Sequence, residues 1–138
     1  MRAEAIFGPV GVLALWTGGV LMMTGFTRVR AIRAGRLHTR AFRLGESPEV
    51  PDEIAVVNRN YMNLLEMPVL FYVVCLSYYV TRRVGPVTLG LAWTYVGLRL
   101  AHSLIHLTTN RVIHRFYVFA VSNVVLVWLW ISFIRRLL

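Results

Sequence analysis

Long apolar runs alternate with short polar segments along the chain. The runs cover about residues 6–27, 53–80, 86–110 and 114–135. Each run is continuously apolar rather than alternating, and as a helix each is long enough to cross about 30 Å of hydrocarbon. The pattern predicts four membrane-spanning helices rather than a β-barrel. We expect an all-α integral membrane protein, a left-handed four-helix bundle that forms a single domain over residues 1–138.

The composition agrees with a membrane protein. Hydrophobic residues make up 57% of the chain, above the 45–50% that is usual in soluble domains. The 15 basic residues, all of them arginine, outnumber 6 acidic ones. Because the arginines cluster between the apolar runs, they indicate loops on a lipid surface rather than a nucleic-acid interface, and we expect membrane lipid as a partner. Cys75 is the only cysteine, so no disulfide can form within the chain.

The arginines also predict an orientation. The first and third connections hold eight of them, at positions 28, 30, 33, 36, 40, 43, 111 and 115, and the opposite side holds five. The more basic connections are expected in the cytoplasm, which places both termini outside. Arg33, Arg36, Arg40 and Arg43 recur at helical spacing, so the first helix is predicted to continue into the headgroup layer. These arginines would contact lipid phosphates or, alternatively, a substrate.

Polar residues inside two of the runs form the main chemical signal. In the second run Arg59, Asn63 and Glu66 share one helical face, since they are spaced by four and three. The third run carries a matching set, which consists of Arg99, His102 and His106. Antiparallel packing would pair 59 with 106, 63 with 102 and 66 with 99. We call these six residues the polar ladder.

Charged groups at this depth are costly and are usually paired or functional. Glu66 and Arg99 could form a salt bridge that only fixes helix packing. The whole polar ladder could instead line a pocket that opens to the cytoplasm. His102 and His106 could begin a metal site, but no third ligand has a fitting spacing, so no metal is expected.

The polar ladder resembles the motif of the MAPEG family, the membrane-associated proteins in eicosanoid and glutathione metabolism. Members have four spans, a basic first loop, and a second helix with Arg, Asn four residues later and Glu three residues after that, followed by proline. Arg59, Asn63, Glu66 and Pro68 follow this order. In the third helix Arg99 matches the family, whereas His102 and His106 stand where glutathione-using members have tyrosines. The layout is similar to an uncharacterised bacterial branch, which implies a bacterial inner membrane.

The resemblance implies a homotrimer that binds glutathione at the cytoplasmic side, between subunits. The expected ligand residues are the polar ladder together with Arg30 and Arg33. Arginines can hold the two carboxylates of glutathione, and a glutamate can hold its ammonium group. Arg111 and Arg115, near the start of the fourth helix, are candidates to stabilise the thiolate.

The resemblance leads to an enzyme hypothesis and a binding hypothesis. As an enzyme, the protein would be a glutathione-dependent transferase or peroxidase that acts on hydrophobic small molecules from the bilayer. As the alternative, it would be a non-catalytic membrane protein that binds a small anionic metabolite or a lipid headgroup. The histidines at positions 102 and 106 put catalysis in more doubt than the fold, because a fold supports many functions.

Overall fold

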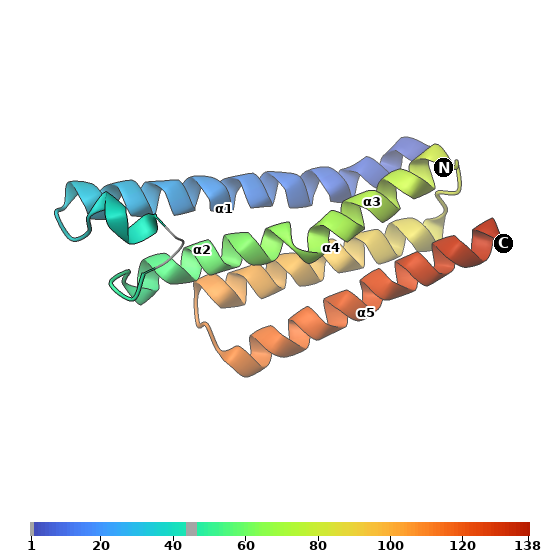
Figure 1. Cartoon of the computed structure of the whole chain (residues 1–138). Coiled ribbons are helices and arrows are strands. Elements are labelled where there is room, and N and C mark those ends of the chain that lie inside the picture. Colours follow the sequence, from blue (N-terminus) through green and yellow to red (C-terminus); the bar gives the residue numbers. More distant parts are fainter. Residues whose placement is uncertain (1, 44–46) are drawn as a thin grey trace.

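Figure 1 shows a computed structural model of the chain, which describes residues 2–43 and 47–138. Residues 44–46 of the first predicted connection lie outside the described residues. Over the described ranges the chain is helical and contains no strand, as the apolar pattern predicts. The elements are η1 (Ala3–Ile6), α1 (Phe7–Arg33), η2 (Thr39–Phe42), α2 (Asp52–Leu65), α3 (Met67–Val80), α4 (Pro86–Leu107) and α5 (Val112–Leu137).

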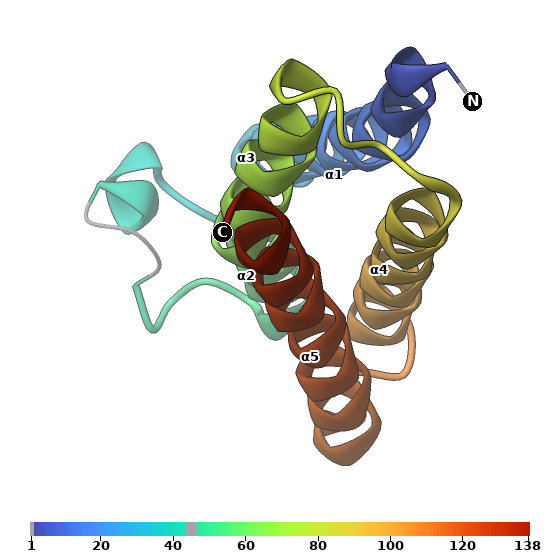
Figure 2. The same ribbon diagram turned by 90° about the vertical axis from the view of Figure 1, so that its right-hand side faces the viewer.

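The long helices lie side by side, and both termini are at the same end of the bundle (Figure 1). Helix α1 packs against α2 and α4, and α5 packs against α3 and α4. The view along the bundle, from the end that holds the termini, shows α3 nearer the viewer than α2 and α4 to the right of α5 (Figure 2). The connection from α1 to α2 and the connection from α4 to α5 therefore share the end opposite the termini.

Three helical stretches are long and apolar enough to cross a membrane, namely Ala3–Arg33, Asp52–Val80 and Val112–Leu137. Four such spans were predicted. The predicted span over residues 86–110 is the one that is missing from these three, and it corresponds to α4. With 22 residues, α4 is long enough to cross the hydrocarbon core. Its polar residues, Arg99 and His106 among them, lower its hydropathy. Helix α4 is thus the polar member of the bundle.

The outer surface of the bundle is apolar. Leu15 is 79% exposed, Met22 74% and Val80 70%. Inside, Phe71 of α3 stacks on Tyr95 of α4 with ring centroids 4.6 Å apart. Large exposed apolar side chains around a packed core suit a hydrocarbon environment, where they cost nothing.

Helix α1 ends earlier than the arginine spacing predicts. It stops at Arg33, and Gly35 adopts a left-handed conformation with φ of +68°. The Gly35 amide donates to the Ile32 carbonyl, and the Arg36 amide donates to the Ala31 carbonyl. This pair of bonds closes a helix at a glycine. The predicted helical continuation through Arg43 is therefore wrong, and only Arg33 of that stripe lies on α1.

The predicted helix over 53–80 is divided at Glu66. The Glu66 backbone, with φ of −80° and ψ of −92°, leaves the helical conformation. Pro68 explains the division, because it has no N–H for the Leu64 carbonyl and its ring crowds that carbonyl. In the first turn of α3 a proline costs nothing, since amides there have no partner within the helix. Glu66 consequently sits between two helices rather than within one.

Candidate functional site

A polar cleft lies between α2, α4 and α5, at the end of the bundle away from the termini. Its volume is about 200 Å³, and its lining residues are Asn63, His102, Val112, Arg115, Phe116 and Phe119. Asn63 and His102 were predicted to face each other across α2 and α4. These two residues line the same cleft, so α2 and α4 bring one of the three predicted pairs together. The pairing of Arg59 with His106 and of Glu66 with Arg99 stays a prediction.

Arg99 is the most buried member of the polar ladder, with no exposed surface. Its Nη2 atom donates to the backbone carbonyl of Asn63, in the last turn of α2. Its guanidinium carbon lies 5.4 Å from the centroid of the Phe119 ring, a cation–π distance. Its Nε and Nη1 atoms have no partner among the residues described.

Glu66 and Arg99 do not form the salt bridge that was one of the two sequence interpretations. Among the described residues no Glu66 oxygen lies within 4.0 Å of an Arg99 nitrogen. The break at Glu66 accounts for this, because it leaves that side chain exposed while Arg99 stays buried. The carboxylate is therefore available at the surface of a single chain.

Arg115 completes the cleft from α5. Its Nη1 atom is 2.9 Å from His106 Nε2 and donates to Asn110 Oδ1, also at 2.9 Å. An arginine is always a donor, so His106 Nε2 accepts and the ring proton is assigned to Nδ1. Asn110 has a left-handed backbone, with φ of +45°, which asparagine tolerates well at a helix end. The turn after α4 thus fixes the guanidinium of Arg115 at the cleft.

Arg111, the other predicted thiolate stabiliser, is placed differently. It precedes the first residue of α5 and is exposed. It does not line the cleft. Of the two candidates, the structure brings only Arg115 to His102 and His106.

Arg30 and Arg33 are not part of the cleft in a single chain. Arg30 lies in α1 and lines a separate pocket of about 360 Å³ with Thr27, Arg36 and Glu53. Arg33 is exposed in the last turn of α1. The loop arginine Arg36 forms an ion pair with Glu53 at 3.4 Å.

The structure contains a second polar cluster that the sequence pattern did not predict. The Ser103 hydroxyl accepts hydrogen bonds from Asn60 Nδ2 at 2.7 Å and from Trp16 Nε1 at 2.8 Å. Asn60 and Ser103 are fully buried, and together with Trp16 they tie α1, α2 and α4 to one another. Asn60 and Ser103 each follow a residue of the polar ladder by one position, but the antiparallel order that pairs 59 with 106 does not pair 60 with 103, so spacing alone did not reveal this contact.

The described residues contain no group of three His, Cys, Asp or Glu side chains that could hold a metal ion. The cleft instead has the Arg115 guanidinium, the His102 ring and the Asn63 amide in its lining, and Arg99 is buried against the Asn63 backbone. Groups of this kind can donate hydrogen bonds to an anion.

A bundle of long apolar helices with a polar cleft that includes Arg115 is typical of an integral membrane protein with a polar site. The sequence model of the MAPEG family matches residues 6–135, which is nearly the whole chain. The chain belongs to the MAPEG family, and the resemblance based on the polar ladder is confirmed. A search of curated proteins and of solved structures found no match.

Proposed function

We propose that the cleft binds glutathione and that the protein is a glutathione-dependent transferase or peroxidase. Membership of a family associated with glutathione and eicosanoid metabolism supports this proposal. The observation that carries it is the position of Arg115, which is held by His106 and Asn110 beside a cleft lined by Asn63 and His102.

The charges around the cleft fit glutathione. Arg59, Arg99 and Arg115 provide three cations against the one carboxylate of Glu66. A ligand that carries two carboxylates, one ammonium group and an ionised thiol offsets this excess. Arg59, which is exposed on α2, would bind a carboxylate of glutathione, and Glu66 would bind its ammonium group. Asn63 donates its side-chain amide to the Arg59 carbonyl, which leaves its Oδ1 atom as an acceptor for the peptide.

The chemistry then requires an ionised thiol. A guanidinium beside the sulfur favours the thiolate over the thiol, and Arg115 is positioned to act in this way. In a transferase reaction the thiolate sulfur would form a bond to an electrophilic carbon of an apolar substrate from the bilayer, while a bond of that carbon breaks and its electron pair leaves with the displaced group. In a peroxidase reaction the sulfur would attack one peroxide oxygen, the O–O bond would break to release an alkoxide, and a second glutathione would reduce the sulfenic acid to a disulfide and water. The thiol proton would leave to water or to a histidine of the cleft.

The size of the cleft indicates that one chain does not complete the site. About 200 Å³ is below the 300–1,000 Å³ that is typical of small-molecule sites. Arg59 and Glu66 are exposed on a single chain. We infer that a neighbouring copy covers them in a homotrimer. Native mass spectrometry in a mild detergent should show a trimer, and monomers alone would contradict this inference.

Calorimetric titration of the detergent-purified protein with glutathione tests the proposal. The wild type should bind. Arg59→Ala should weaken binding about 10- to 150-fold, the effect of losing a charged hydrogen bond. Arg40→Ala is a matched control, since Arg40 is an exposed arginine of the first connection. Equal binding by Arg59→Ala and the wild type would refute the assignment of the site.

The small volume of the cleft also suits a second function, in which a non-catalytic protein binds an anionic metabolite smaller than glutathione. Titration with glutathione separates the two functions. A folded trimer that does not bind glutathione, but does bind a dicarboxylate such as succinate, would favour the second one.

A further inference from the structure

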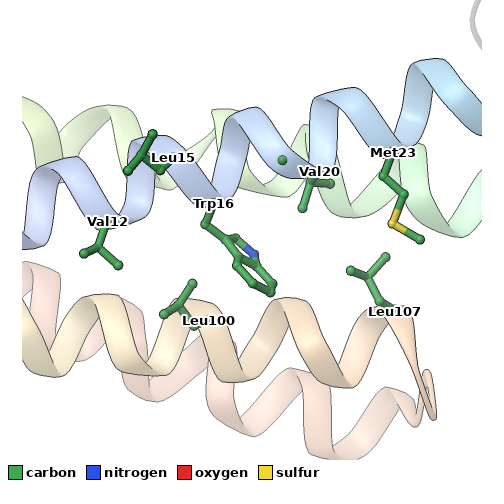
Figure 3. Close-up of a pocket in the computed structure, with 8 residues that line it drawn as sticks. Val12, Leu15, Trp16, Val20, Met23, Leu100 and Leu107 are labelled. Carbon is green, nitrogen blue, oxygen red and sulfur yellow. The ribbon is translucent and has the colours of Figure 1, made fainter.

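An apolar groove runs along the outside of the bundle between α1 and α4 (Figure 3). Its volume is about 440 Å³, and its lining residues are Val12, Leu15, Trp16, Gly19, Val20, Met23, Leu100 and Leu107. The Trp16 indole crosses the space between the two helices, and its hydrogen bond to Ser103 holds it there. We call this space the lipid groove, for the reasons that follow.

The lipid groove has the length of one leaflet. From Val12 to Met23 the helix rises about 16 Å, and half of a typical hydrocarbon core is about 15 Å. The groove is open to the bilayer, since Leu15 is 79% exposed and Met23 is 43% exposed. Its lining offers almost no polar atom other than the indole nitrogen, which Ser103 already occupies.

A cationic pocket lies beyond the end of the groove on the same helix. Arg30 follows Met23 by seven residues, which is two turns and about 10 Å, so both side chains share a face of α1. Arg30 lines a pocket of about 360 Å³ together with Thr27. The Glu53 carboxylate in that pocket is paired with Arg36. Within the part of the chain that the structure describes, Arg30 has no acidic partner.

We propose that the lipid groove and the Arg30 pocket together bind one anionic phospholipid of the surrounding bilayer. An acyl chain lies in the groove against Trp16, and the phosphate accepts hydrogen bonds from the Arg30 guanidinium in the pocket at the end of the groove. An apolar groove as long as one leaflet, followed by the Arg30 guanidinium, matches an acyl chain joined to a negative headgroup. This site is separate from the proposed glutathione cleft, and it assigns Arg30 to lipid.

Fluorescence quenching at Trp16 tests the proposal. Replacing Trp93, Trp128 and Trp130 by phenylalanine leaves Trp16 as the only tryptophan of the chain. The protein is placed in phosphatidylcholine nanodiscs that contain increasing amounts of phosphatidylglycerol or phosphatidylcholine with brominated acyl chains. Brominated phosphatidylglycerol should reach half-quenching at an about five-fold lower mole fraction, the effect of one arginine at a lipid surface.

Two matched pairs of variants locate the contact. Gly19→Leu should fill the groove and reduce quenching by both lipids, whereas Gly18→Leu should not. A Cβ atom added at either glycine meets no atom of another part of the chain within 4 Å, so both variants should fold, and only Gly19 lines the groove. Arg30→Gln should abolish the preference for phosphatidylglycerol, whereas Arg33→Gln should keep it.

Equal quenching by the two lipids in the wild type would overturn the proposal, as would equal effects of the two glycine variants. Absence of quenching by either lipid, together with a changed oligomeric state for Gly19→Leu in native mass spectrometry, would show that a second copy occupies the groove. Loss of glutathione binding leaves these outcomes unaffected, because the readout depends on Trp16 alone.

Discussion

Arg99 carries a charge in the interior of a membrane protein, and its surroundings explain how the bundle tolerates it. Its guanidinium donates to the Asn63 carbonyl, next to the end of α2 at Leu65. The last four carbonyls of a helix lack partners within the helix and carry a partial negative charge. Arg99 therefore supplies a donor and a positive charge where the interrupted helix needs both. This contact makes Arg99 a positioning residue for Asn63.

Replacing Arg99 should destabilise the protein, whereas replacing Glu66 should not. Arg99→Met leaves a buried carbonyl unpaired, which costs about 1–3 kcal/mol. Glu66→Gln removes an exposed charge with no direct ion pair to Arg99, so the thermal midpoint should hardly move while glutathione binding weakens. Thermal unfolding in detergent and calorimetry measure the two effects. A large loss of stability in Glu66→Gln would show that the carboxylate supports the fold.

Arg115 and Arg111 form a natural comparison for the thiolate role. Arg115→Gln should lower the ultraviolet absorbance of bound thiolate and reduce turnover about 10- to 150-fold, since a charged contact to sulfur is lost. Arg111→Gln should leave both unchanged, because Arg111 lies outside the cleft. The reverse result would show that Arg111, which precedes α5, stabilises the thiolate in place of Arg115.

At the scale of the element, the break between α2 and α3 has the largest consequence for the site. It places Glu66 in the connection between two helices rather than on a helical face. It also ends α2 close to Asn63, whose carbonyl accepts a hydrogen bond from Arg99. The geometry of the cleft therefore depends on Pro68.

Pro68→Ala should straighten this stretch. Restoring the N–H allows a continuous helix, in which Asp52 and Val80 would be about 42 Å apart. Spin labels at these two positions should report a longer distance in the variant, and glutathione affinity should fall as Glu66 turns. Pro86→Ala is the matched control, because Pro86 begins α4 and interrupts no helix. An unchanged distance would mean that Arg99, not Pro68, holds the break.

The sequence predicts the helices better than it predicts their ends and their polar contacts. Spacing alone brought Asn63 opposite His102, because an antiparallel pair has a single consistent order. It did not predict that α1 ends at Gly35, since the arginines beyond still follow a helical period. It also did not reveal that Arg99 contacts a backbone carbonyl, because sequence patterns show side chains but not the main-chain groups that a break sets free.

At the scale of the whole molecule, both termini and the α3–α4 connection lie at one end of the bundle. The first and third connections lie at the other end and carry more arginines. The positive-inside rule then predicts that the first and third connections face the cytoplasm.

Cysteine labelling tests this orientation. In a chain with Cys75→Ser, a membrane-impermeant thiol reagent added from outside should label a cysteine at Arg82 and spare one at Arg40. Both positions are exposed, so access to the reagent depends on the side of the membrane. The opposite labelling pattern would show that the first and third connections face the outside of the membrane.

The polarity of α4 also bears on how the chain enters the membrane during its synthesis. A single arginine at the centre of a span costs about 2.5–3.5 kcal/mol on insertion scales, and α4 carries two buried histidines as well. The sequence order makes α2 available before α4 leaves the ribosome. Arg99 can then find the Asn63 carbonyl as α4 enters. Helix α5, which is long and apolar enough to cross a membrane, can follow and place the Phe119 ring over the guanidinium. Helix α4 therefore depends on a helix made earlier for its own insertion, and a chain that lost α2 would be expected to expose α4 to the quality-control proteases of its membrane.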